Sequence, residues 1–252
     1  MTVLSAHTRI NRGTGRPCFT RKRWRRVVCK DYGSLMPDIR DTQISYDQVA
    51  AEYATQYGDE LTRKPFDRKM LDWLIEKVGG RGEICDLGCG PGQVAGYLHS
   101  RGASTCGLDL SPEMVKHAQQ LHPQIKFQSG NMLALTDVAD GVFGGLAAFY
   151  ALIHISPVQM LQALGEIRRV LQPSGALLVT FHIGNEIKHL DEWWAKPVNL
   201  DFNFYTTEWF KAQLLTAGFE ITEAIERDPY PETVEFQSRR AYIFAQKPAL
   251  YT

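Results

Sequence analysis

The stretch Ile84-Cys85-Asp86-Leu87-Gly88-Cys89-Gly90-Pro91-Gly92 joins a short apolar run to a glycine-rich turn. A second acidic residue, Asp109, lies at the end of the next apolar run. A strand, a glycine turn, a helix and a second strand that ends in a carboxylate form a nucleoside-binding half of an α/β fold. The turn glycines let the backbone approach a ligand closely, and the carboxylate of Asp109 can accept hydrogen bonds from both ribose hydroxyls.

The sequence of this turn does not match two common nucleotide-binding patterns. The dinucleotide pattern needs glycine or alanine at its sixth position, which is Gln93 when counted from Gly88. The Walker pattern needs a lysine followed by serine or threonine after the glycines, and none follows. What remains resembles motif I of the class I S-adenosylmethionine (SAM) methyltransferases, an acidic residue followed by Gly-x-Gly-x-Gly, here Asp86, Gly88, Gly90 and Gly92.

This resemblance extends from about Tyr46 to the C-terminus, and it implies methyl transfer from SAM with S-adenosylhomocysteine (SAH) as the product. It implies that the backbone of Gly88 and Gly90 faces the amino-acid part of SAM and that Asp109 holds the ribose. Asn131 stands where family members often have aspartate, and its side-chain oxygen can accept a hydrogen bond from the adenine amino group. The resemblance implies a wider cofactor site that also includes Asp86, Cys89, Leu110, Met132, Phe149 and Tyr53.

The charge is distributed unevenly along the 252 residues, although the formal net charge is zero. Residues 1–35 hold seven Arg and two Lys against one acidic residue, so the remainder is acidic, which argues against a nucleic-acid substrate. Hydrophobic residues make up 44%, enough for one large domain, and no run of 18 apolar residues predicts a membrane helix. Five cysteines without a Cys-x-x-Cys pair fit a reducing, cytoplasmic setting.

The basic N-terminal segment, residues 1–35, lacks apolar periodicity and contains Arg21-Lys22-Arg23-Trp24-Arg25-Arg26. We interpret it as a disordered extension to a domain that covers residues 36–252. Four other interpretations stay open: an organelle presequence, a nuclear signal, an RNA-binding arm, or a translation start at Met36.

Apolar periodicity predicts two helices over 45–59 and 65–78, so residues 36–80 would form a helical cover. Strands and helices then alternate through residues 81–182, the expected SAM-binding core. The predicted strands of this core are 82–86, 104–109, 125–128, 142–149 and 176–182, and its predicted helices are 91–101, 112–121 and 156–171.

The C-terminal part departs from this rhythm. Residues 183–206 are rich in aromatic side chains and predict a lid over an acceptor pocket. Residues 207–252 predict a helix over 207–216 and an antiparallel pair of strands, 219–227 and 240–246. The pattern fits the class I methyltransferase (Rossmann-like) fold that the resemblance implies: a seven-stranded, mostly parallel sheet with an antiparallel last strand and helices on both faces.

His154 follows the fourth predicted strand, and ligands of open α/β sheets bind beyond the ends of the strands. An imidazole with an ordinary pKa of ~6.5 accepts a proton at neutral pH, so His154 is the expected general base. Packing at a helix start is the alternative for His154. The other expected acceptor contacts are Tyr46, Tyr150, His182, Trp194, Tyr205 and Arg239. The alternative for Tyr46 is packing in the core, and the alternative for Arg239 is a solvent-exposed position at the start of a strand.

The sequence thus predicts a SAM-dependent methyltransferase that acts on a small-molecule acceptor. The chain lacks Asn-Pro-Pro-Tyr and Asp-Pro-Pro-Tyr, the motifs of amino methylation on adenine, cytosine or glutamine. It also lacks the acidic cluster of metal-dependent O-methyltransferases, so we expect no metal. An RNA methyltransferase that uses residues 1–35 and a non-catalytic SAM-binding module stay open as alternatives.

Overall fold

The computed structural model of the protein describes residues 24–27 and 38–249. Within the expected N-terminal extension, residues 1–35, the structure describes only Trp24–Val27, which form strand β1. The other residues of that extension and the possible start at Met36 lie outside the described residues.

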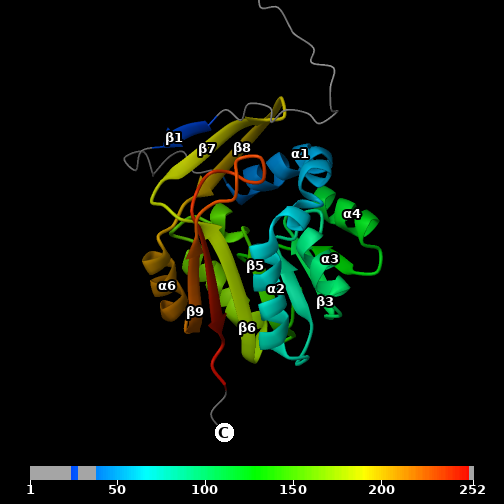
Figure 1. Ribbon diagram of the computed structural model, residues 1–252, viewed down its shortest axis with the longest axis vertical. Helices are drawn as coiled ribbons and strands as arrows, with labels where there is room; N and C mark the ends of the chain where they lie inside the picture. Colours follow the sequence, from blue (N-terminus) through cyan, green and yellow to red (C-terminus); the bar gives the residue numbers. More distant parts are fainter. Residues whose placement is uncertain (1–23, 28–37, 250–252) are drawn as a thin grey trace, which may run out of the picture.

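Seven strands form the central sheet in the order β4-β3-β2-β5-β6-β10-β9 (Figure 1). Neighbouring strands from β4 to β6 pair in parallel, while β10 runs antiparallel to both β6 and β9. The predicted fold class is therefore confirmed. The strand bounds are β2 Ile84–Leu87, β3 Thr105–Asp109, β4 Lys126–Ser129, β5 Phe143–Phe149, β6 Leu171–His182, β9 Glu220–Arg227 and β10 Arg240–Gln246.

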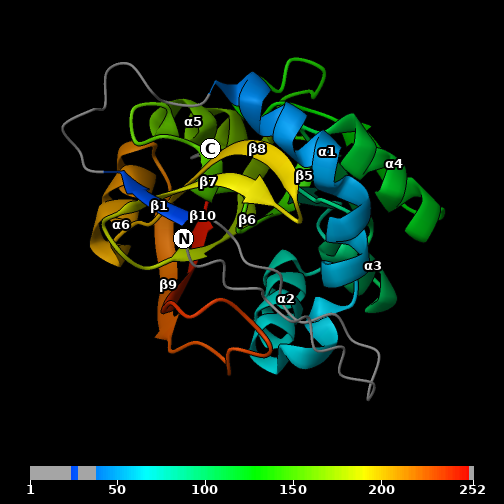
Figure 2. The same ribbon diagram turned by 90° about the horizontal axis from the view of Figure 1, so that it is seen from above.

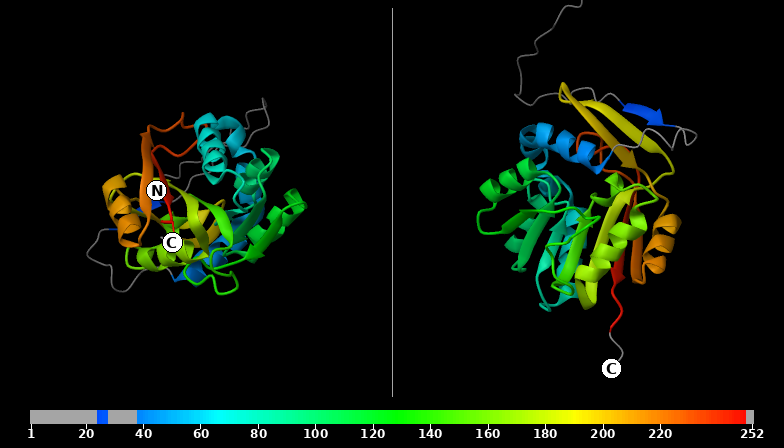
Figure 3. Two further views of the ribbon diagram at one scale, coloured as in Figure 1. Left: turned by 90° about the horizontal axis from the view of Figure 1, so that it is seen from below. Right: turned by 180° about the vertical axis from the view of Figure 1, so that it is seen from behind.

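Helices cover both faces of this sheet, and Figure 3 shows α2 and α5 on opposite sides of it. Their bounds are α2 Pro65–Val78, α3 Gln93–Ser100, α4 Pro112–Leu121, α5 Met160–Val170 and α6 Thr207–Thr216. Because helices cover both faces, β2 and β5 are almost continuously buried, as expected for the centre of a parallel sheet. At Gly145 an added Cβ would lie 2.4 Å from Val78 Cγ2, so α2 packs directly on the backbone of β5.

A second layer lies over the carboxyl ends of the central strands, as the view from above in Figure 2 shows. It consists of helix α1 (Ile39–Tyr57), a 3₁₀ turn at Glu60–Arg63 (η2) and a small sheet. That sheet has the order β1-β7-β8, with β7 at Ile187–Trp193 and β8 at Lys196–Asn203. We call α1 and the β7–β8 hairpin the cover.

Polar contacts join the β7–β8 hairpin to α1 and join α1 to the core. Lys196 Nζ pairs with Glu52 at 2.7 Å, which ties the hairpin to α1. On its other side, α1 presents Asp47 to the start of α4. There Asp47 accepts hydrogen bonds from Ser111 Oγ at 2.5 Å and Glu113 N at 3.3 Å. The cover is therefore anchored to the β3–α4 junction.

Three element boundaries differ by four or more residues from the sequence predictions. Helix α1 begins at Ile39, because Asp38 and Asp41 form a capping box upstream of the predicted start. Helix α5 begins only at Met160 and leaves 156–159 as a turn, and β6 already begins at Leu171, which pairs with Phe143. The predicted lid at 183–206 contains the strands β7 and β8, which sequence periodicity did not show.

Candidate active site

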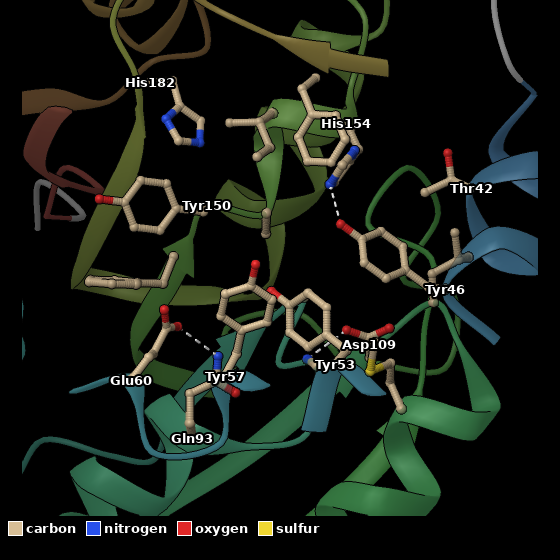
Figure 4. A pocket seen from close by; sticks show the side chains of 18 of the residues that line it. Thr42, Tyr46, Tyr53, Tyr57, Glu60, Gln93, Asp109, Tyr150, His154 and His182 are labelled. Atoms are coloured by element: carbon tan, nitrogen blue, oxygen red, sulfur yellow. Dashed lines mark hydrogen bonds between the residues drawn. The ribbon is translucent and has the colours of Figure 1, made fainter. Parts of the chain in front are cut away.

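A pocket lies between the carboxyl ends of β2, β3 and β5 and the cover (Figure 4). Its lower wall, which we call the floor, contains the glycine turn after β2 and the end of β3. Its upper wall, which we call the roof, is made of aromatic side chains from the cover. The floor residues are Gly88, Gly90, Asp109, Leu110, Asn131 and Met132, and the roof residues are Tyr46, Tyr53, Tyr57, Trp193 and Phe202.

Asp109 is the charged group of the floor. Its Oδ2 accepts a hydrogen bond from Gly90 N at 2.7 Å, and its Oδ1 accepts one from Ser111 N at 2.8 Å. Each carboxylate oxygen has a second lone pair, so both can still accept from a ligand. Burial raises the pKa of Asp109 to about 6, while the hydrogen bonds from Ser111 and Gly90 act in the opposite direction. At neutral pH the group is therefore mainly an acceptor.

The glycine turn brings main chain to the surface of the floor. Gly88 has φ +73°, and a Cβ there would lie 2.5 Å from Ala151 Cβ, so the turn packs tightly against the end of β5. Gly90 has φ +52°, and its nearest neighbours, Tyr53 and Gln93, would be 3.8 and 3.9 Å from an added Cβ. A side chain at position 90 would therefore occupy the pocket itself.

Asp86, the acidic residue of the motif, lies beneath this turn and not in the pocket. Its Oδ2 accepts a hydrogen bond from Ala95 N at 3.0 Å, in the first turn of α3. Burial raises the pKa of Asp86 to about 7. Cys89 is also buried, in a small cluster with Phe127 and Val115. Both residues support the floor from behind.

His154 and Tyr46 form a hydrogen-bonded pair that spans the pocket wall (Figure 4). The Tyr46 hydroxyl lies 2.7 Å from His154 Nε2, and His154 Nδ1 lies 2.9 Å from the carbonyl oxygen of Asp201. A carbonyl only accepts, so Nδ1 carries the proton and Nε2 accepts from Tyr46. Burial lowers the pKa of His154 to about 4, so the ring is neutral at pH 7.

Tyr150 and His182 line the side of the pocket opposite Tyr46. Tyr150 has φ +56°, a strained conformation for a non-glycine residue, and its N–H donates to Thr180 Oγ1 at 2.9 Å. His182 Nδ1 lies 2.5 Å from Arg240 Nη1, and since guanidinium only donates, Nδ1 is the acceptor. Backbone strain such as that at Tyr150 is often found at functional sites. The Tyr150 ring lies beside His182, with ring centroids 5.3 Å apart.

Comparison with known proteins gives a consistent result. Residues 84–175 match the family model described as a methyltransferase domain. The chain is 28% identical over 172 residues to malonyl-[acyl-carrier protein] O-methyltransferase of Pseudescherichia vulneris, a match that covers 67% of each chain. It is 32% identical over 118 residues to demethylmenaquinone methyltransferase of Thermus thermophilus, covering 44% of this chain and 51% of that one. The chain thus spans between about half and two thirds of these relatives.

The solved structure of 1,6-didemethyltoxoflavin-N1-methyltransferase from Burkholderia thailandensis has the same fold. It aligns with a TM-score of 0.64 over 84% of this chain and 91% of its own, at 18% identity. The chain has the class I SAM-dependent methyltransferase fold, and its residues 84–175 match a methyltransferase-domain family.

The floor of this methyltransferase fits SAM. A glycine at position 90 leaves main chain open to the pocket, and both oxygens of Asp109 have acceptor capacity left for two ribose hydroxyls. Asn131 Oδ1 accepts from Leu133 N at 2.9 Å and has one lone pair left for an adenine amino group. The residues expected to bind the cofactor that line the pocket are Gly88, Gly90, Asp109, Leu110, Asn131, Met132, Phe149 and Tyr53.

Three residues expected to contact the acceptor lie outside the pocket. Arg239 is more than half exposed and pairs with Glu226 at 2.8 Å, while its neighbour Arg240 lines the pocket. Likewise Trp193 lines the pocket and Trp194 does not. Tyr205 is buried and donates to the carbonyl of Ile155. In both pairs of neighbours the sequence located the segment but not the side chain that faces inward.

The pocket is also lined by residues that the sequence did not predict, among them Thr42, Glu60, Lys64 and Gln93. They come from α1, from η2 and its end, and from the first position of α3. No motif marks them, and only the packing of these elements brings them together. Within the part of the chain that the structure describes, no group of three or more His, Cys, Asp and Glu is placed to hold a metal ion, and no helix has the length and apolarity to cross a membrane.

Proposed function

We propose that this methyltransferase methylates a small molecule that enters between Tyr150 and His182 on one side and Tyr46 and His154 on the other. The observation that carries this proposal is the continuity of one pocket from the floor at Asp109 to these four side chains. SAM, when bound, supplies an activated methyl group on its sulfonium sulfur.

The residues of the pocket would act mainly by placing the acceptor. The buried roof residues Trp193 and Phe202 would help to exclude water once SAM and an acceptor fill the pocket, and an enclosed site strengthens each polar contact inside it. Holding two reactants in line can supply up to ~7–11 kcal/mol of the barrier reduction. An enclosed aromatic chamber favours a small planar acceptor over a macromolecular one.

Tyr46 and His154 would handle the acceptor proton as a pair. Because Tyr46 already donates to His154 Nε2, an acceptor hydroxyl or amine can donate only to the Tyr46 oxygen. As that proton moves to Tyr46, the tyrosine proton would move to Nε2. His154 with a pKa of about 4 is a weak base, so this relay would orient the acceptor more than it drives deprotonation.

Transfer from methyl-labelled SAM tests the proposal. The purified protein is incubated with labelled SAM and a small-molecule metabolite extract, and in parallel with total RNA, and methylated products are identified by mass spectrometry. We expect label in one small molecule and none in RNA. Label only in RNA would contradict a small-molecule acceptor, and binding of SAM without transfer to any fraction would favour a non-catalytic module.

The cellular setting is also part of this proposal. Cys85, Cys89 and Cys106 are buried free thiols that form no disulfide. Buried free thiols next to a binding loop favour a reducing compartment such as the cytoplasm.

A further inference from the structure

One side of the pocket contains a polar cluster outside the expected contacts to the ribose and to the acceptor. It consists of Glu60, Lys64 and Gln93, which all line the pocket. Figure 4 shows Glu60 and Gln93 joined by a hydrogen bond on one side of Tyr53, with Asp109 on the other side of that ring. The cluster therefore lies across the glycine turn from the ribose site.

The hydrogen bonds of the cluster fix the orientation of Gln93. Glu60 Oε2 pairs with Lys64 Nζ at 2.6 Å, and Glu60 Oε1 lies 3.1 Å from Gln93 Nε2. A carboxylate only accepts, so the amide nitrogen of Gln93 must face Glu60 and Oε1 must face elsewhere. A Cβ built on Gly90 would lie 3.9 Å from that Oε1, which places the oxygen beside the turn that forms the floor.

Gln93 Oε1 is buried and accepts no hydrogen bond from the described residues. A buried acceptor without a donor is disfavoured, and native structures normally supply a partner. Here a ligand can supply it, because the same residue lines the pocket. The missing partner must be a hydrogen-bond donor, and the adjacent Glu60 carboxylate favours one with a positive charge.

We propose that Gln93 Oε1 and Glu60 receive the α-ammonium group of SAM and that Lys64 Nζ faces its carboxylate. This inference rests on SAM being the cofactor. A zwitterion adds no net charge to the site, and the Glu60–Lys64 ion pair offers one partner of each sign. The amino-acid end of the ligand would thus be recognised by side chains of η2, of the residue that ends it and of α3, and the glycine turn would supply main chain between them and Asp109.

Calorimetry with three ligands tests this assignment on the full-length protein. The ligands are SAH, the SAH analogue in which hydrogen replaces the α-amino group, and 5′-methylthioadenosine, which has the nucleoside and sulfur but no amino acid. For Gln93→Met we expect SAH affinity to fall about tenfold, because one charge-assisted hydrogen bond is lost. Affinity for the other two ligands should stay within about twofold, since neither has the ammonium group.

Gln119→Met is the matched control, because Gln119 donates to the Phe127 carbonyl and lies outside the pocket. It should leave all three affinities unchanged. Binding of 5′-methylthioadenosine by Gln93→Met shows that the variant is folded. Equal loss for all three ligands, or no loss for SAH, would overturn the inference alone. A wild-type protein that binds neither SAH nor 5′-methylthioadenosine would overturn the cofactor assignment and this inference together.

Discussion

The floor and the roof of the pocket are built in different ways. The floor takes Gly88, Gly90 and Asp109 from neighbouring strand ends, and its binding groups are main chain and one carboxylate. The roof takes Tyr46 and Trp193 from segments far apart in the sequence, and its groups are aromatic rings. A floor made of backbone is sensitive to any added side chain, whereas a roof made of rings can change its shape by single substitutions.

The floor therefore suits a ligand that is the same in every such enzyme, and the roof suits an acceptor that can differ between enzymes. The floor positions fit a nucleoside, which every enzyme of this class shares, and its hydrogen bonds are directional. The roof rings contact each other edge to face, as between Tyr46 and Trp193 with centroids 6.2 Å apart, and such pairs contribute only about 0.5–1.5 kcal/mol each beyond their area. Acceptor preference can therefore diverge in the roof while the floor is retained.

The largest effect is expected for Asp109→Ala. The substitution removes two acceptors for ribose hydroxyls and the contacts that hold Gly90 N and Ser111 N. SAH affinity should fall by about 100-fold or more, the equivalent of two hydrogen bonds to a charged group. Calorimetry measures this, with the thermal midpoint as a fold control. Equal SAH binding by both proteins would remove Asp109 from the site.

The same carboxylate predicts a pH dependence. Because the pKa of Asp109 is raised to about 6, protonation below that pH removes the acceptor, and SAH affinity should fall by up to tenfold for each further pH unit. Asp109→Asn should bind SAH weakly and without this slope.

Gly88→Ala should strongly destabilise the floor. A Cβ at this position would lie 2.5 Å from Ala151 Cβ, and the backbone has φ +73°. Gly102→Ala is the matched control, since Gly102 also has positive φ but nothing within 4 Å of an added Cβ. Both should lose about 1–2 kcal/mol from backbone strain, and Gly88→Ala a further 1–3 kcal/mol from overpacking. Denaturant unfolding that gives equal losses would show that the contact relaxes freely.

His154, which is neutral and hydrogen-bonded to the roof residue Tyr46, should make stability depend on pH. The imidazole pKa is ~6.5 when unfolded and about 4 when folded, so protonation favours unfolding. The contribution of His154 is full above pH 6.5 and is lost as the pH falls toward 4, with a loss of about 2 kcal/mol between pH 8 and pH 5. The difference in unfolding free energy between the wild type and His154→Gln should shrink by that amount, and a constant difference would show that folding does not shift the pKa of His154.

The smallest effect is expected at Arg239. Its exposed pair with Glu226 contributes at most about 1 kcal/mol, so Arg239→Ala should leave SAH affinity and methyl transfer within about twofold of the wild type. Arg240→Ala is the contrasting variant, because the buried Arg240 donates to the Phe236 carbonyl at 2.7 Å and contacts His182. A larger loss of transfer in Arg239→Ala than in Arg240→Ala would restore the original expectation for Arg239.

The sequence predicted the floor far better than the roof, and the reason is physical. The turn at Gly88 and the strand end at Asp109 are local features, because glycine conformations and strand periodicity act over a few residues. The roof depends on pairing between β7 and β8 and on the docking of α1, which bring together residues such as Tyr46 and Trp193. Aromatic composition singled out residues 183–206, but which of two adjacent residues faces inward is set by strand register, a long-range property.

Asp47 links the two regions. It lies on α1, which carries roof residues, yet it accepts hydrogen bonds from Ser111 and Glu113 at the start of α4. Moving α1 aside to admit a ligand would leave the Ser111 hydroxyl and the Glu113 amide without their acceptor. Those two residues follow directly on the strand end that carries Asp109. Opening of the entrance is thus energetically linked to the ordering of the loop that grips the nucleoside, so a bound nucleoside that orders this loop would also favour the closed position of α1.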